Sequence, residues 1–124
     1  PEKEWLSGFA ELFKHALIAD PELWDHLETS GMGGLTLNPE WIERASRIKE
    51  KVVDSDFKES GKRKVLNYGH TLGHAIESVS FYMDDEPMTH GNAIAIGMKL
   101  ANRIAVKKGI LPLSVSKKLE NFID

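Results

Sequence analysis

The chain has 124 residues, a formal net charge of −3 and 41% hydrophobic residues, enough for one modest core. It contains no cysteine, which excludes disulfides and thiolate metal sites and leaves His, Asp and Glu as possible metal ligands. The slightly acidic balance gives no support for general nucleic-acid binding, and no apolar run approaches the roughly 18 residues of a membrane span. We therefore expect neither a nucleic-acid nor a membrane partner, and we predict a cytoplasmic location.

Helical periodicity extends along the chain and predicts an all-α fold, organised as one helical domain over residues 1–124. In the first half, apolar residues three and four apart predict a helix from Trp5 to Ile18. Asp20 followed by Pro21 is an N-cap signal that predicts a short helix through about Glu28. The three glycines in residues 30–37 predict a loop. Asn38 and Pro39 then repeat the start signal for a helix to about Asp54.

The second half begins with an interruption at residues 56–61 and a short basic segment at residues 62–68. The helical period returns from about Gly69 to Tyr82, and residues 84–87 predict a turn. Residues 89–108 form the most apolar segment, which we expect to be the central core helix, with Gly109 as its C-cap. Ser114 is predicted to cap a last helix that ends at about Ile123.

Positive charge is concentrated in residues 44–64, which hold eight Lys or Arg and four Asp or Glu. This excess is compatible with a basic patch that receives a small anion. On charge alone, a solvated helix face is the more common explanation of such an excess. Arg63 and its neighbouring lysines provide fixed positive charge, and Asn67 can both donate and accept hydrogen bonds.

Three of the five histidines are candidates for chemistry. His70 and His74 are four residues apart and so share one face of the predicted helix. Zinc hydrolases use this spacing with a glutamate after the first histidine, but Thr71 stands there, so that function loses its general base. His90 could complete a site of two histidines and one carboxylate, for which spacing leaves three candidates. These candidates are Glu11, Glu59 and Glu77.

The alternative interpretation of these histidines is structural. An isolated pair on an amphipathic helix can simply be exposed, and His90 can be an ordinary residue at the beginning of a helix. His15 and His26 belong to no such pattern, and we predict both to be surface residues.

Four segments, in this order, resemble the carboxy-terminal helical domain of the 3-dehydroquinate synthase family, within the sugar phosphate cyclase superfamily. They cover most of the chain: residues 8–14, residues 49–63, the run from Leu66 to Glu77, and the run from His90 to Met98. Other cyclases of the superfamily and a non-catalytic helical module of the same fold remain alternatives.

The resemblance also implies roles for individual residues. Glu11, His70 and His90 match the metal-binding positions of the family, for zinc or cobalt. His74 matches a histidine near the substrate and is then not a ligand. Positions that match substrate-binding residues are Lys14, Lys49, Arg63, Asn67 and His74. Among these, Lys14, Lys49 and His74 are the candidates for catalysis, and Glu59 matches an acidic residue at the edge of the site.

The reaction that the resemblance implies converts 3-deoxy-D-arabino-heptulosonate 7-phosphate into 3-dehydroquinate and phosphate, in the shikimate pathway. It proceeds through transient oxidation by bound NAD, elimination of phosphate, reduction, ring opening and an aldol closure. The family binds NAD mainly in an amino-terminal α/β domain, and this chain has no glycine-rich dinucleotide motif. We therefore expect a fragment of a two-domain, homodimeric enzyme, with no cyclase activity and at most weak metal affinity alone.

Overall fold

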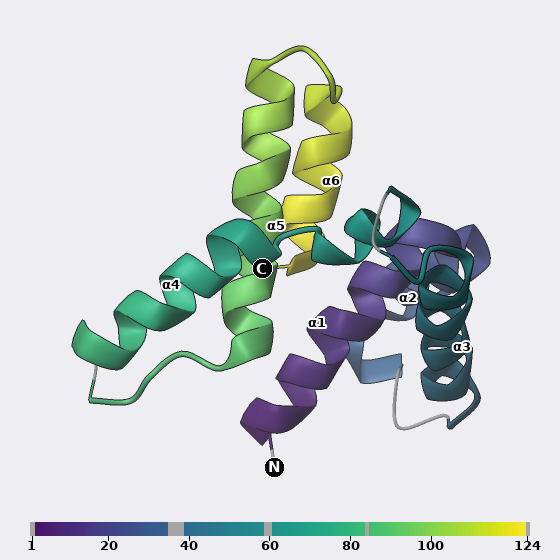
Figure 1. Cartoon of the computed structure of the whole chain (residues 1–124), viewed down its shortest axis with the longest axis horizontal. Coiled ribbons are helices and arrows are strands. Elements are labelled where there is room, and N and C mark those ends of the chain that lie inside the picture. Colours follow the sequence, from purple (N-terminus) through teal and green to yellow (C-terminus); the bar gives the residue numbers. More distant parts are fainter. Residues whose placement is uncertain (1, 35–38, 59–60, 84, 124) are drawn as a thin grey trace. The chain divides into compact units, whose positions relative to one another are not determined.

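The computed structural model describes residues 2–34, 39–58, 61–83 and 85–123 (Figure 1). Within these residues the secondary structure is helical and no strand is found, which confirms the all-α prediction. None of the described helices is long and apolar enough to cross a membrane. The helices are α1 (Glu2–Ala19), α2 (Pro21–Gly34), α3 (Pro39–Ser55), the 3-10 helix η1 (Lys62–Asn67), α4 (His70–Met83), α5 (His90–Lys107) and α6 (Leu113–Ile123).

The chain divides into two compact units. Unit 1 comprises residues 1–10 and 68–124, and unit 2 comprises residues 11–67, so helix α1 contributes to both. The single helical domain expected over residues 1–124 stays a prediction.

Helix α5 is the centre of unit 1, because it packs against both α4 and α6 (Figure 1). Its side chains Ala93, Ile94 and Met98 are fully buried, as expected for the most apolar segment of the chain. Thr89 caps its beginning by accepting a hydrogen bond from the backbone N–H of Asn92. The C-cap residue is Lys108, one position before the predicted Gly109, and Gly109 follows it with φ of 71°.

Glycines allow α4 and α5 to approach closely. A Cβ atom at Gly73 would lie 2.7 Å from Cδ1 of Ile94, within the closest packing of the two helices. Gly69 has a φ of 80° just before α4 begins, a conformation that few residues other than glycine adopt. This crossing brings the beginning of α4 next to α5, and the histidines lie on these two helices.

Unit 2 is built from the second part of α1, α2, α3 and η1. Phe13, Leu23 and Leu27 are buried in it. Asp20 is the N-cap that the sequence predicts, since its Oδ1 accepts the backbone N–H of Leu23 at 3.0 Å. Arg44 of α3 donates hydrogen bonds to both carboxylate oxygens of Asp20 and thereby ties α3 to the beginning of α2.

Some local predictions are wrong. Helical structure continues beyond Glu28 to Gly34, although Gly31 interrupts it with φ of 58° and ψ of −173°. The predicted loop thus begins inside the assigned helix, and its last residues, like the Asn38 cap, lie outside the described residues. Ser114 lies within the first turn of α6 and is not its cap. The carbonyl of Pro112 accepts the N–H groups of Val115 and Ser116 instead.

The prediction that His15 is a surface residue is also wrong, because its exposed fraction is 6%. Its neighbours Phe13, Lys14 and Ala16 are buried as well, so this turn of α1 is covered on a wider face than its apolar residues suggest. His26 is half-buried and stacks on Trp41, with 4.4 Å between ring centroids.

Candidate metal centre and substrate-binding residues

Three imidazoles meet where α4 and α5 begin. His70 is the first residue of α4, His74 follows one turn later, and His90 is the first residue of α5. One ring nitrogen of each lies within 4.8 Å of the others, and the ring centroids are 5.3 to 5.6 Å apart. Neutral imidazole nitrogens are common ligands of zinc and cobalt, so the donor set of this histidine cluster fits a divalent metal ion.

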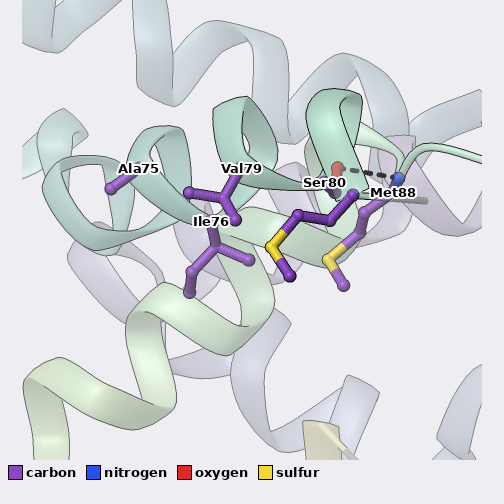
Figure 2. A pocket seen from close by; sticks show the side chains of 6 residues that line it. Ala75, Ile76, Val79, Ser80 and Met88 are labelled. Atoms are coloured by element: carbon purple, nitrogen blue, oxygen red, sulfur yellow. Dashed lines mark hydrogen bonds between the residues drawn. The ribbon is translucent and has the colours of Figure 1, made fainter.

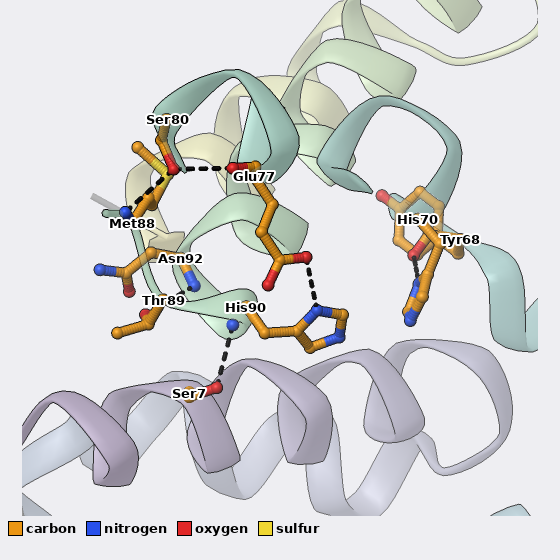
Figure 3. A network of polar contacts seen from close by, with 10 residues as sticks. Ser7, Tyr68, His70, Glu77, Ser80, Met88, Thr89, His90 and Asn92 are labelled. Atoms are coloured by element: carbon orange, nitrogen blue, oxygen red, sulfur yellow. Dashed lines mark hydrogen bonds and ion pairs between the residues drawn. The ribbon is translucent and has the colours of Figure 1, made fainter. Parts of the chain in front are cut away.

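His70 and His90 are each held through Nδ1 (Figure 3). Nδ1 of His70 lies 3.2 Å from the carbonyl oxygen of Tyr68, and Nδ1 of His90 lies 3.1 Å from Oε2 of Glu77. Both partners are acceptors, which favours the tautomer with hydrogen on Nδ1 and the lone pair on Nε2. Metal-binding histidines are typically oriented in this way by a carbonyl or carboxylate.

His74 differs from these two histidines. It is exposed, and within the described residues no hydrogen bond to its ring is found. Its ring contacts the other two imidazoles edge-on or at a tilt. An exposed ring without an orienting acceptor can rotate and exchange protons, which suits a substrate-facing role better than a fixed ligand.

A second layer of hydrogen bonds supports the cluster. The hydroxyl of Tyr68 donates to Oδ1 of Asn102 at 2.6 Å, and Asn102 is buried on α5. Burial raises the pKa of Tyr68, and its bond to Asn102 opposes that rise only in part. The backbone of Tyr68, whose carbonyl faces His70, is therefore anchored to α5.

Serine side chains fix the surroundings of His90 (Figure 3). Oγ of Ser80 donates to the carbonyl of Glu77 and accepts the backbone N–H of Met88, which holds the α4–α5 connection against α4. Oγ of Ser7 accepts the backbone N–H of Gly91 at 2.9 Å. A Cβ atom on Gly91 would lie 2.2 Å from Cα of Ser7, so glycine is required for this approach.

In unit 2, Glu11 and Lys14 form an ion pair on α1. Nζ of Lys14 lies 2.7 Å from Oε2 of Glu11, and the exposed fraction of Lys14 is only 2%. Burial lowers the pKa of Lys14, the contact with Glu11 opposes this, and the charge of Lys49 lowers it further. The ammonium groups of Lys14 and Lys49 thus interact electrostatically.

The remaining predicted substrate residues of unit 2 lie on α3 and η1. Lys49 and Asn67 are exposed, whereas Arg63 is half-buried. The guanidinium of Arg63 donates to the carbonyl of Phe57 at 3.3 Å, and its backbone N–H donates to Oδ2 of Asp56 at 3.0 Å. Glu59 lies outside the described residues.

Unit 1 also contains an apolar pocket beside α4 (Figure 2). It is lined by Ala75, Ile76, Val79, Ser80, Met83 and Met88. The one polar side chain among them, Ser80, already makes both of the hydrogen bonds described above. This pocket has no group for acid–base or metal chemistry, and the histidine cluster remains the candidate site of unit 1.

Sequence reasoning missed the contacts that orient the histidines. Glu77 was a candidate ligand, but the structure places its carboxylate against Nδ1 of His90. The helical period could have indicated that Glu77 lies near the histidines, because residues 70, 74 and 77 share one face of a helix. The Tyr68–Asn102 bond joins residues 34 positions apart, and no local pattern predicts it.

The family model described as 3-dehydroquinate synthase C-terminal matches residues 8–124. The chain belongs to the 3-dehydroquinate synthase family. Proteins named 3-dehydroquinate synthase from Lactococcus lactis and Dehalococcoides mccartyi are 38% and 40% identical to it. These matches cover 98% and 99% of the chain but 35% and 34% of the relatives.

The chain therefore spans about a third of the length of these 3-dehydroquinate synthases. The family match includes Glu11 of unit 2 as well as the histidine cluster of unit 1.

Proposed function

We propose that this chain supplies the metal-binding and part of the substrate-binding residues of a 3-dehydroquinate synthase. The reaction converts 3-deoxy-D-arabino-heptulosonate 7-phosphate into 3-dehydroquinate and phosphate, in the biosynthesis of aromatic amino acids. The observation that carries the proposal is the histidine cluster within the family-matched segment, with two of its rings held through Nδ1.

In this proposal Glu11, His70 and His90 hold a divalent metal ion, zinc or cobalt. The two histidines offer Nε2, and Glu11 offers a carboxylate oxygen. Bound there, the metal supplies Lewis-acid stabilisation of negative charge on a substrate oxygen. The charge of the ligand set, two neutral rings and one carboxylate, leaves the centre with a net positive charge that favours an anionic substrate.

Lys14 and Lys49 are proposed to bind the anionic groups of the sugar phosphate, together with Arg63 and Asn67. The mutual repulsion of the two ammonium groups supports this role, because an anion between them would relieve it. Arg63 can hold a carboxylate or phosphate with two parallel hydrogen bonds. Asn67 can donate to a hydroxyl or accept from it.

His74 is proposed to move protons between substrate and solvent during phosphate elimination. Its exposure and its freedom from an orienting acceptor support this role. Lys14 is a second candidate, because its lowered pKa makes the neutral amine more accessible than that of an ordinary lysine.

The proposal extends to the full-length enzyme. We expect NAD to bind mainly in an amino-terminal domain, the active enzyme to be a cytoplasmic homodimer, and residues 1–124 alone to have no cyclase activity. These expectations follow from the family resemblance, and the partial coverage of the relatives is compatible with them.

The test is phosphate release from 3-deoxy-D-arabino-heptulosonate 7-phosphate by a full-length protein containing this chain, with NAD and zinc. The double variant His70→Ala/His90→Ala should lose both zinc and turnover. His74→Ala should keep stoichiometric zinc and lose turnover by a factor of roughly 100 or more. Turnover of a different sugar phosphate in its place would favour another cyclase. Unchanged zinc in the double variant would contradict the ligand assignment.

A further inference from the structure

The contact between Glu77 and His90 suggests that Glu77, which is outside the proposed set of metal ligands, contributes to the metal centre. Oε2 of Glu77 lies 3.1 Å from Nδ1 of His90, and the second ring nitrogen lies on the far side of the ring from the carboxylate (Figure 3). The Glu77 side chain is 22% exposed, compared with 42% for His90. The carboxylate of Glu77, which is the acceptor of this contact, is thus the better shielded of the two groups.

We propose that Glu77 is a positioning residue for His90. Its carboxylate accepts the Nδ1 hydrogen, selects the tautomer with a free Nε2 and fixes the rotation of the ring. A carboxylate in this position also strengthens the bond of the imidazole to a metal ion. The inference rests on the proposed metal centre. In it, Glu77 contacts His90 and orients its ring, and Glu77 is not itself a metal ligand.

The surroundings of Glu77 support this assignment. Ser80 binds the carbonyl of Glu77 and the N–H of Met88, and Thr89 caps α5 directly before His90. The backbone on both sides of the contact is thus fixed by hydrogen bonds. A carboxylate in the middle of α4 and an imidazole at the beginning of α5, both on backbone held in this way, lose little additional backbone entropy when they pair.

His70 gives an internal comparison. Its Nδ1 meets a backbone carbonyl, at 3.2 Å from the oxygen of Tyr68. A carbonyl selects the same tautomer but carries no net charge. The two rings therefore receive different acceptors, one neutral and one anionic, and the anionic one belongs to the ring at the beginning of α5.

The experiment separates orientation from charge with two variants made in a full-length protein that contains this chain. Glu77→Gln retains an acceptor oxygen and loses the charge, whereas Glu77→Met loses both at similar length. Asp85→Asn, which removes an exposed carboxylate in the α4–α5 connection, is the matched control. Two quantities are measured: the His90 tautomer in metal-free protein, by long-range ¹H–¹⁵N NMR, and the affinity for zinc, by competition with a chelator.

We expect Glu77→Met to give a mixed His90 tautomer and to weaken zinc binding by roughly 10- to 100-fold. Glu77→Gln should keep the tautomer and lose less affinity than Glu77→Met, and Asp85→Asn should match the wild type in both. Wild-type affinity in Glu77→Met would overturn the inference. So would a loss as complete as that of His90→Ala, because Glu77 would then be a ligand itself.

Failure of the proposed function gives a different result. If the wild-type chain and the full-length enzyme bind no zinc or cobalt, the metal centre is refuted, and the positioning role is refuted with it. If the wild type binds metal and only the Glu77 variants behave unexpectedly, the metal centre stands and the positioning role is wrong.

Discussion

A Cβ atom on Gly97 would lie 2.0 Å from the carbonyl oxygen of Gly69. That oxygen accepts the backbone N–H of Gly73, and so it belongs to the first turn that carries His70 and His74. The spacing between the two histidine-bearing helices is therefore set by backbone contact, which side-chain movement cannot relieve.

Replacing Gly97 by alanine should separate α4 from α5. Overpacking of a tight crossing costs about 1–3 kcal/mol in the free energy of unfolding, and the displaced α4 would carry His70 and His74 away from His90. We expect Gly97→Ala to lower both stability and zinc affinity, as measured by urea unfolding and chelator competition.

Gly8→Ala provides the control for this substitution, because no atom lies within 4 Å of a Cβ there. It should stabilise α1 by about 0.5–1 kcal/mol, as alanine does in a helix. Equal effects of the two substitutions would show that the crossing tolerates a methyl group.

Removing the hydroxyl of Tyr68 should weaken the support of His70. Tyr68→Phe leaves Oδ1 of Asn102 buried without its donor, which costs about 1–3 kcal/mol. We expect a lower midpoint in urea unfolding with an unchanged slope. Tyr82→Phe is the matched control, since Tyr82 is 90% exposed and should show no measurable change. A Tyr68→Phe variant as stable as the control would contradict a structural role for this bond.

Protonation of Asp20 at low pH should lower the free energy of unfolding. Burial raises the pKa of Asp20, but the hydrogen bonds from Arg44 and from the backbone of Leu23 lower it by more. The net shift of the pKa is therefore downward from 3.8. The carboxylate therefore stabilises the folded chain above pH 3.8, and this contribution is lost as the pH falls through the folded-state pKa.

Asp20→Asn keeps a capping oxygen and removes the charge that Arg44 binds. It should cost roughly 1–2 kcal/mol at pH 7, and the difference from the wild type should shrink below pH 3.8. Urea unfolding at several pH values measures this, with Asp25→Asn on the exposed face of α2 as control. A difference that is independent of pH would mean that the charge of Asp20 does not contribute.

Unlike the charge of Asp20, the charge of Lys14 should destabilise the folded chain. Its pKa is lowered from 10.5 chiefly by burial, so the charged amine destabilises the folded state. The unfolded chain binds more protons between the folded-state pKa and pH 10.5, and stability rises with pH across that window.

Replacing both members of the ion pair, as in Glu11→Leu/Lys14→Met, should therefore stabilise the chain by about 1 kcal/mol at pH 7, and the gain should become smaller toward pH 10.5. Lys14→Met alone removes the ammonium partner of Glu11 and should not give this gain. In the full-length enzyme the same variant should lose activity if Lys14 binds substrate. Lys49→Met, at an exposed position, should change stability by less than about 0.5 kcal/mol. Loss of stability in the double variant Glu11→Leu/Lys14→Met at pH 7 would contradict the idea that burial of the charged Lys14 destabilises the folded state.

Much of the fold follows from local signals in the sequence. The cap at Asp20, the period of α4 and the apolar length of α5 each depend on residues within a few positions, and the structure agrees with them. Ser114 was misplaced because Pro112 offers its carbonyl to the same turn. Burial of His15 was missed because side-chain polarity does not reveal which face of α1 is covered.

The candidate site was predictable in part. The spacing of His70 and His74 places them on one face, but it cannot place His90, which depends on how α4 and α5 cross. That crossing is set by glycines whose role appears only when both helices are present. The orienting acceptors are a carbonyl and a carboxylate, and only the second belongs to a side chain that a sequence pattern could identify.

All three clustered imidazoles lie within one helical hairpin, between residues 70 and 90 of α4 and α5. Closing so short a loop costs little entropy, and contacts that are local in the chain form early in folding. The histidines can therefore meet early in folding, through contacts within residues 70–90 alone. In the proposed metal centre, an ion bound by two of these histidines would also hold the hairpin together and so contribute to the stability of the fold.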